Sequence, residues 1–294
     1  MQAQGSDAPR AVIVISSHVA RGSVGNRAAV FALETLGFPV WAVPTVILPW
    51  HPGHGPATRI VPPPADFAAL MKDLEGARWL GEVGAVLSGY LGDAAQAEAV
   101  ASLVGAVKAR NPRAVYVCDP VIGDHGGLYV PEATAVAIRD RLMPIADVAT
   151  PNRYELAWMT GRDLPDLAAT VAAAAAAAPP AMLVTSAPPT LDGGIANLLV
   201  RDGQALLAEH RTIARPPNGL GDLTAALYLA RTLQRVPAEE ALRSTTAAVY
   251  EILARTMARG GDELQLETDA ECLARPTAAV QLRRLPAFGP ALTA

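Results

Sequence analysis

The sequence predicts an α/β protein built on a mostly parallel sheet with helices on both faces. Short apolar runs rich in β-branched residues alternate along the chain with stretches of helical periodicity. Two of these runs, 84–88 and 114–118, are almost continuously apolar, as strands buried on both faces are. Polar residues follow the carboxyl ends of the runs, which is where such sheets bind ligands.

The individual elements follow from this alternation. The Pro-rich stretch 49–64 is expected to be a long loop rather than a linker, because the alternation resumes after it. The alanine run 172–178 needs no special function, since alanine is the best helix former. We expect strands at 11–15, 40–48, 84–88, 114–118, 182–186 and 195–200, and helices at 26–36, 66–75, 93–110, 132–142, 153–160, 166–178, 222–235 and 238–258.

The chain is expected to form one domain with short flanking segments. Its 294 residues could hold one large domain or two small ones, but the pattern runs through residues 11–274 as a single unit. Residues 1–10 are polar, carry no signal-peptide pattern and are expected to be flexible. Residues 275–294 are rich in Pro and Ala and are expected to be a loosely packed tail.

Composition argues against several classes of function. The sequence has no apolar run of about 18 residues, which argues against a membrane span. Its net charge is −4 and it has no clustered basic stripe, which argues against a nucleic-acid-binding surface. The two cysteines, Cys118 and Cys272, cannot build a disulfide framework or a zinc site, and they fit a reducing cytoplasm.

The most informative motif is Asn218-Gly219-Leu220-Gly221-Asp222, which leads directly into a helical stretch. Glycines let backbone N–H groups turn inward, and a helix start adds unpaired N–H groups and a positive dipole end, so together they suit a phosphate. Asp222 would be the first acidic residue of that helix. A carboxylate there can act as a base or simply cap the helix, and the motif alone leaves both interpretations open.

Further polar groups follow the other predicted strands. Phosphoryl transfer to an alcohol needs a base, donors around the phosphoryl group and a cation. Asp119, Asp124 and Glu155 could hold Mg²⁺ directly or through water, because Mg²⁺ keeps several of its waters. Neither a P-loop motif nor a Gly-x-Gly-x-x-Gly motif after the first strand is present. The remaining strand ends carry Ser16-Ser17-His18, Ser88-Gly89-Tyr90, Thr150-Pro151-Asn152 and Thr185-Ser186.

Several blocks resemble pyridoxal kinases and occur in family order over roughly residues 11–235. Ser17-His18-Val19-Ala20-Arg21-Gly22-Ser23-Val24-Gly25-Asn26-Arg27-Ala28-Ala29 is similar to the family's N-terminal signature. Tyr116-Val117-Cys118-Asp119-Pro120-Val121-Ile122-Gly123-Asp124, Leu128-Tyr129-Val130-Pro131-Glu132 and Ala149-Thr150-Pro151-Asn152-Arg153-Tyr154-Glu155 resemble its central segments. Gly219 to Asp222 match the Gly-x-Gly-Asp of the wider ribokinase-like superfamily. The resemblance implies a ribokinase-like three-layer α/β/α sandwich.

The resemblance also implies roles for individual residues. Asp222 would be the catalytic base that takes the proton from the vitamin's 5′-hydroxyl, with Gly219 and Gly221 in the anion hole. The implied substrate-binding positions are Ser17, Val24, His51, Pro52, Tyr90 and Asp222. The implied ATP-binding positions are Asp119, Asp124, Tyr129, Thr150, Asn152, Glu155, Thr185, Ser186, Leu220 and Gly221, of which Asp119, Asp124 and Glu155 would bind Mg²⁺, directly or through water.

Some of these side chains also have a purely structural interpretation. Ser17 could merely end a strand, and Tyr90 could be an ordinary half-buried aromatic residue. Glu155 could be a first-turn acid that favours the helix dipole, and Asp119-Pro120 could be a plain turn. The sequence does not separate these interpretations from the functional ones.

The substrate loop departs from the family pattern. His51-Pro52-Gly53 stands where the family usually has His-Thr-Gly or His-Thr-Gln, and proline brings neither a hydroxyl nor an N–H group. Leu48-Pro49-Trp50 replaces the usual Phe-Ser-Asn, Leu220 replaces a common threonine, and the loop 124–129 is shorter than in some relatives. These changes bear more on the predicted identity of the substrate than on the predicted reaction.

The predicted function is therefore a pyridoxal kinase that uses ATP and Mg²⁺ to make pyridoxal 5′-phosphate and ADP in cytoplasmic vitamin B6 salvage. The resemblance also implies a homodimer and admits a monovalent cation, which the residues themselves do not show. The alternatives are a kinase for another hydroxymethyl heterocycle, such as hydroxymethylpyrimidine, or for a sugar, and a non-catalytic pyridoxal-binding protein. The intact Gly219–Asp222 motif argues against the last.

Overall fold

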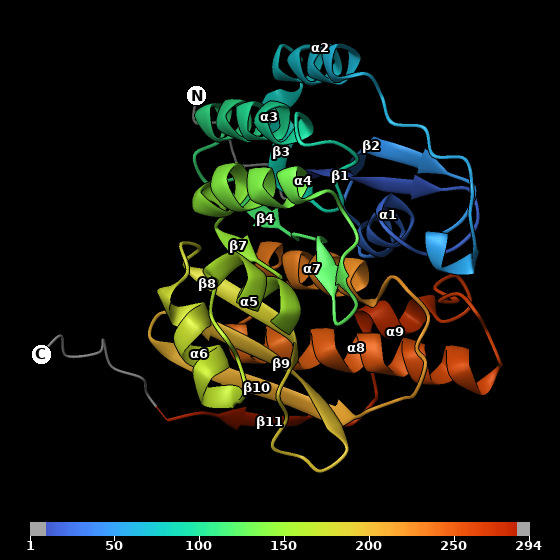
Figure 1. Cartoon of the computed structure of the whole chain (residues 1–294), viewed down its shortest axis with the longest axis vertical. Helices are drawn as coiled ribbons and strands as arrows, with labels where there is room; N and C mark the ends of the chain where they lie inside the picture. The colour runs from blue at the N-terminus through green and yellow to red at the C-terminus, as the bar shows by residue number, and fades with distance from the viewer. Residues whose placement is uncertain (1–9, 287–294) are drawn as a thin grey trace, which may run out of the picture.

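The computed structural model describes residues 10–286, which form a nine-stranded sheet between two layers of helices (Figure 1). The strand order is β11-β10-β9-β8-β7-β4-β3-β1-β2. The predicted three-layer α/β/α architecture is therefore confirmed. The predicted flexible N-terminus lies outside the described residues except for Arg10, as do residues 287–294.

Six consecutive strands of the sheet are parallel. β1 pairs with β2 on one side and with β3 on the other, and β3, β4, β7 and β8 follow in parallel register. β1 is apolar on both faces and fully buried at Val12, Ile13, Val14 and Ile15, as a doubly covered strand should be. The bounds are β1 Ala11–Val19, β2 Val40–Leu48, β3 Val83–Ser88, β4 Val115–Cys118, β7 Val148–Ala149 and β8 Ala181–Ala187.

The other end of the sheet is antiparallel. β9 (Gly194–Arg201) runs antiparallel to β8, and β10 (Gln204–Arg211) pairs with β9 through a two-residue hairpin. Asp202 and Gly203, the two hairpin residues, have φ of 51° and 72°, as the turn type that matches strand twist requires. The strand pattern predicted β9 but missed β10.

The C-terminal segment differs from the predicted loose tail. Residues 281–284 form β11 (Gln281–Arg284), which pairs antiparallel with β10. Leu282 packs against the core, and Arg283 lies 3.2 Å from the buried carboxylate of Glu209 on β10. The prediction was wrong here because β10 offers an open edge that a short, polar strand can cover, whatever the composition around it.

The helices divide between the two faces of the sheet. Val12 and Val14 belong to the hydrophobic cluster on one face, and Ile13 and Ile15 to the cluster on the other. No helix within residues 10–286 is long and apolar enough to cross a membrane. The first face is covered by α1 (Asn26–Thr35), α7 (Leu220–Leu233), α8 (Ala238–Ala258) and α9 (Ala270–Ala274), and the second by α2 (Pro64–Glu75), α3 (Gln96–Arg110), α4 (Glu132–Ala137), α5 (Arg153–Thr160) and α6 (Leu167–Ala176).

Short elements complete the fold around the ends of the strands. A small hairpin of β5 (Gly123–Asp124) and β6 (Gly127–Leu128) packs against the start of α5 and is drawn in green in Figure 1. A π-helical segment at Ile138–Leu142 continues α4, in place of the single helix predicted over 132–142. The 3₁₀ turns are Pro52–His54, Leu80–Glu82 and Met143–Ile145.

Candidate active site

A cavity of about 520 Å³ lies at the carboxyl ends of the parallel strands. Residues that follow β1, β2, β3, β4 and β7 line it, together with the end of β8 and the start of α7. Every predicted site residue lines this cavity except Leu220. Leu220 is half-buried and instead packs against the hydrophobic cluster of α1 and α7.

The start of α7 is built by a turn that only glycine fits. Gly219 precedes the helix with φ of 96°, and a Cβ atom there would lie 2.1 Å from the carbonyl oxygen of Ser23. That close approach places the first turn of α7 against the β1–α1 loop. The unpaired N–H groups of this turn and the positive end of the helix therefore border the cavity beside Gly221 and Asp222.

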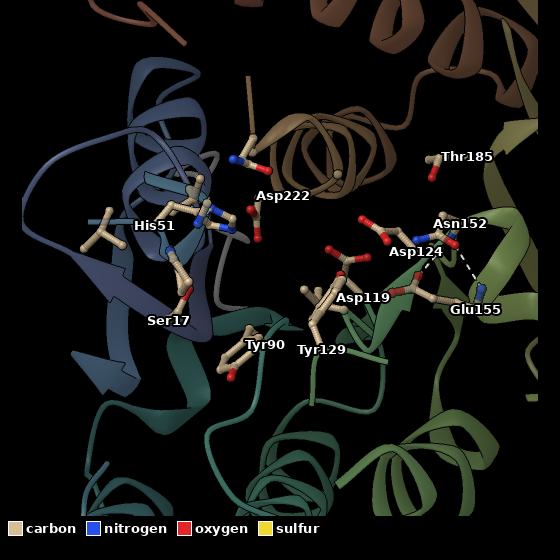
Figure 2. Close-up of a pocket in the computed structure, with 18 of the residues that line it drawn as sticks. Ser17, His51, Tyr90, Asp119, Asp124, Tyr129, Asn152, Glu155, Thr185 and Asp222 are labelled. Carbon is tan, nitrogen blue, oxygen red and sulfur yellow. Dashed lines mark hydrogen bonds between the residues drawn. The ribbon is translucent and has the colours of Figure 1, made fainter. Parts of the chain in front are cut away.

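Asp222 is the acidic residue in the first turn of α7, and its carboxyl group points into the cavity (Figure 2). Removal from water raises the pKa of Asp222 to about 6, although the N–H groups of Gly25 and of Asp222 itself oppose the rise. A carboxylate with a pKa near 6 is mostly ionised at neutral pH yet more basic than an ordinary aspartate. It is therefore suited to accept a proton from an alcohol.

The opposite end of the cavity is organised by a capping box at the start of α5. Asn152 Oδ1 accepts a hydrogen bond from the N–H of Glu155 at 2.9 Å, and Glu155 Oε2 accepts one from the N–H of Asn152 at 2.8 Å (Figure 2). Glu155 Oε1 accepts from the N–H groups of Ile122 at 2.8 Å and Gly123 at 3.4 Å. Both carboxylate oxygens of Glu155 are therefore occupied by backbone groups.

Glu155 holds a turn in an unusual backbone conformation. Val121 in this turn has φ of 47°, which β-branched residues rarely adopt, so the turn depends on contacts around it. Asn152 Nδ2 adds a hydrogen bond to the Gly123 carbonyl at 2.8 Å. Glu155 and Asn152 thus position the segment that carries Asp119 at one end and Asp124 at the other.

Burial raises the pKa of two carboxyl groups beside this turn, those of Asp119 and Glu155. Asp119 is almost fully buried and accepts a hydrogen bond from Thr150 Oγ1 at 2.8 Å. Its pKa is raised well above the usual value, first by burial and then by the negative charges of Glu155 and Asp222. Burial likewise raises the pKa of Glu155 to about 7, despite its three backbone hydrogen bonds. Such a site favours the binding of a cation.

The carboxylates do not form a complete metal cage. Within residues 10–286 no group of three or more His, Cys, Asp or Glu side chains could hold a metal ion. Mg²⁺ in nucleotide sites is commonly held by one or two carboxylates together with phosphate oxygens and water, so the donor set fits that ion. Asp119 and Asp124 are the available carboxylates, since both oxygens of Glu155 are engaged.

The end of the cavity away from α5 is made by the loop that follows β2. His51 Nδ1 accepts a hydrogen bond from the N–H of Gly53 at 3.0 Å, so this histidine caps the 3₁₀ turn Pro52–His54. His54 Nε2 donates to Glu263 Oε1 at 2.7 Å, and Glu263 is buried after the end of α8. This contact anchors the loop to the C-terminal part of the chain. Ser17, His51 and Tyr90 lie around Asp222 in Figure 2.

The model of the phosphomethylpyrimidine kinase family matches residues 67–266. The chain is 38% identical over 281 residues to a pyridoxal kinase PdxY of Rubrobacter xylanophilus, covering 93% of this chain and 97% of that protein. It is 40% identical over 263 residues to a pyridoxal kinase PdxY of Granulibacter bethesdensis, covering 86% and 92%. The chain belongs to the pyridoxal kinase family. The predicted family is therefore confirmed.

Solved structures of the pyridoxal kinase family share the fold over almost the whole chain. The pyridoxal kinase from Leishmania donovani in complex with ADP and pyridoxamine superposes with a TM-score of 0.88 at 29% identity, covering 94% of this chain and 100% of that one. The same kinase in complex with ADP and pyridoxine superposes with a TM-score of 0.87 at 28% identity, covering 94% and 99%. The ribokinase-like fold that the resemblance implied is confirmed.

Several cavity residues escaped the sequence prediction. Asn218 opens the glycine motif and lines the cavity. Its Nδ2 atom lies close to Gly53, because a Cβ atom at Gly53 would lie 3.2 Å from it. Arg59 is the only Arg or Lys between Arg27 and Lys72, and this isolated positive charge could have indicated a role. The Pro-rich sequence around it predicted only a loop. The cavity residues not predicted are Val19, Leu48, Gly53, Arg59, Val121 and Asn218.

Proposed function

We propose that the chain is an ATP-dependent pyridoxal kinase, which transfers the γ-phosphoryl group of ATP to the 5′-hydroxyl of pyridoxal. The products are pyridoxal 5′-phosphate and ADP. The observation that carries the proposal is the position of Asp222, a carboxyl with a pKa of about 6 in the first turn of α7. A base and an anion-binding helix start coincide there, and phosphoryl transfer to an alcohol needs both.

The reaction follows from this coincidence. Asp222 accepts the proton of the 5′-hydroxyl as its oxygen attacks the γ-phosphorus. The bond from that phosphorus to the bridging oxygen breaks, and ADP leaves with the bonding electrons. The N–H groups at the start of α7, from Gly219 to Asp222, would stabilise the negative charge on the transferred phosphoryl oxygens. The proton remains on Asp222 until the product leaves.

The nucleotide would bind on the side of the cavity that carries Asp119 and Glu155. Mg²⁺, when bound, neutralises charge on the ATP phosphates. We assign its contacts to Asp119 and Asp124, with Glu155 acting through water and through the turn that it holds. A monovalent cation would suit the same acidic environment. The remaining ATP contacts are assigned to Tyr129, Thr150, Asn152, Thr185, Ser186 and Gly221.

The alcohol substrate would occupy the other side of the cavity. The implied contacts are Ser17, Val24, His51, Pro52 and Tyr90, all of which line it. Pyridoxal or another vitamin B6 form is the proposed partner, in a cytoplasmic salvage reaction.

The protein is also proposed to be a homodimer. β2 is an edge strand of the sheet, and it exposes Ile47 beside Ile60, which is also exposed. Exposed apolar side chains at the edge of a sheet support an interface there. Light scattering coupled to size-exclusion chromatography would measure the mass. A single 30.5 kDa species at micromolar concentration would contradict the proposal.

A second candidate is a kinase for hydroxymethylpyrimidine. The match to the phosphomethylpyrimidine kinase family and the loss of a donor at Pro52 favour it. ADP release should be measured in parallel with pyridoxal, pyridoxine, pyridoxamine, hydroxymethylpyrimidine and ribose. We expect the highest kcat/KM with a vitamin B6 form. Fastest turnover of the pyrimidine would replace the first assignment, and no turnover with any alcohol would favour a non-catalytic binding protein.

A further inference from the structure

Arg59 reaches the cavity from the long loop that joins β2 to α2. Its Nη2 donates a hydrogen bond to the Gly92 carbonyl at 2.7 Å and a longer one to Tyr90 Oη at 3.3 Å. The backbone beside it is also fixed, because Ile60 and Ile47 exchange hydrogen bonds of 3.0 and 2.8 Å. The guanidinium group is therefore held at the cavity wall although the residue is exposed to solvent.

The charge of Arg59 is isolated in its surroundings. The cavity wall contains the carboxylates of Asp119, Asp124, Glu155 and Asp222, and among residues 10–286 Arg59 is the only Arg or Lys that lines it. Within the described structure its Nη1 and Nε atoms have no hydrogen-bond partner. An arginine keeps its positive charge at neutral pH, so these N–H groups are available to an anionic or electron-rich atom of a ligand.

Arg59 lies at the end of the substrate pocket away from Asp222. The hydroxyl of Tyr90 points away from Asp222 in Figure 2, and Arg59 contacts that hydroxyl. A substrate whose hydroxymethyl group meets Asp222 would extend its ring along Tyr90 toward Arg59. Ring substituents remote from the hydroxymethyl group would then lie within its reach.

The chemistry of the ring identifies the group that Arg59 would bind. In pyridoxal and its relatives, the carbon meta to the one that bears the hydroxymethyl group carries an oxygen, the 3-oxygen. This phenolic oxygen is negatively charged when the ring nitrogen is protonated. Guanidinium N–H groups form strong, charge-assisted hydrogen bonds to such an oxygen. Pro52, on the same loop, has no donor of its own to offer.

We propose that Arg59 is a specificity-determining residue that binds the 3-oxygen of pyridine substrates. The inference rests on the proposed pyridoxal kinase function. Hydroxymethylpyrimidine has an uncharged ring nitrogen in place of the carbon that bears the 3-oxygen. Arg59 therefore favours vitamin B6 forms over the pyrimidine, and it supplies the donor that the loop lacks at Pro52.

The test compares Arg59→Met with wild type on two substrates, pyridoxine and 3-deoxypyridoxine, at saturating ATP. Losing a charge-assisted hydrogen bond at a solvent-accessible site should raise the KM for pyridoxine about 10-fold, with kcat little changed. The KM for 3-deoxypyridoxine and the KM for ATP should change by less than about 2-fold. Arg113→Met is the matched control, because Arg113 is exposed just before β4, at the amino-terminal ends of the strands and so on the side opposite the cavity.

Each outcome decides the proposal. Equal effects of Arg59→Met on both substrates, or no effect on pyridoxine, would overturn the role of Arg59 while leaving the kinase assignment standing. Turnover of neither pyridine by the wild type would overturn the kinase assignment and this inference together. Wild type alone gives an independent check that needs no variant to fold, since it must prefer pyridoxine to 3-deoxypyridoxine by about 10-fold in kcat/KM.

Discussion

The two ends of the cavity are built in different ways. At the proposed nucleotide end, the side-chain hydrogen bonds span at most 33 positions, from 3 between Asn152 and Glu155 to 33 between Glu155 and Ile122. At the proposed substrate end, His54 is anchored by Glu263, which is 209 positions away, and the N–H of Tyr90 donates to Ser16 Oγ across 74 positions. The proposed nucleotide end therefore depends on contacts within one stretch of the chain, residues 119–155, whereas the proposed substrate end depends on contacts between more distant segments. We therefore expect substitutions in the loop after β2 to change substrate choice more than phosphoryl transfer.

The largest effect on turnover is expected at Asp222, where the two ends of the cavity meet. Asp222→Asn keeps the size of the side chain but cannot accept a proton, and loss of a positioned base costs about 10²–10⁴ in turnover. ATP affinity should be retained, because the N–H groups at the start of α7 are unchanged. Steady-state kinetics and nucleotide binding by calorimetry would measure both quantities. Near-normal turnover of Asp222→Asn would show that Asp222 only caps the helix.

The pH dependence of the reaction tests the same group without a mutation. A base acts only when unprotonated, and burial raises the pKa of Asp222 to about 6. The kcat/KM for pyridoxal should therefore fall as the pH drops through 6, by about 10-fold per pH unit once the carboxyl is protonated. The profile should be recorded for wild type and for Glu155→Gln. An acid limb that vanished in Glu155→Gln would assign the ionisation to Glu155 instead.

The nucleotide end alone should respond to changes in its acidic side chains. Asp119→Asn keeps the oxygen that Thr150 contacts but removes a negative charge, so the Mg²⁺ needed for half-maximal rate should rise roughly 10- to 100-fold. Glu155→Gln should act in the same direction, because an amide group would meet backbone N–H donors at one of its ends. Asp73→Asn, on the exposed side of α2, is the matched control. If the Mg²⁺ titrations of both variants overlay that of wild type, Asp119 and Glu155 have only a structural role.

The smallest effect is expected at the anchor of the substrate loop. Glu263→Ala removes the hydrogen bond to His54, and a contact of this kind is worth about 2- to 10-fold in affinity. The KM for pyridoxal should rise by that amount, while kcat and the KM for ATP stay constant. His54→Ala should behave alike, and the double variant should be no worse than either single one. A parallel rise in the KM for ATP would show that the two ends of the cavity are coupled.

Local sequence determined most of the fold and the parts of the site that follow strands. Apolar runs identified β1, β2, β3, β4, β8 and β9, although not β7 at the centre of the sheet, and the Gly219–Asp222 motif located the helix start that borders the cavity. Parallel strands end at one edge of a sheet, so polar residues that follow different strands must meet there. This is why Asp119, Thr150 and Thr185 line one cavity, although each lies in a different part of the sequence.

Tertiary structure alone decided the remaining features. Residues 281–284 of the expected tail form β11 because they pair with β10. Their local sequence shows no preference that predicted a strand. The sequence did not indicate a role for Arg59 or Glu263. Arg59 lies in a loop and Glu263 in the C-terminal part of the chain, and each acquires its role only from the residues that pack beside it. Local motifs specify backbone conformation through short-range hydrogen bonds and sterics. Contacts across tens or hundreds of residues depend on how the finished layers bring their loops together, which a single sequence does not display.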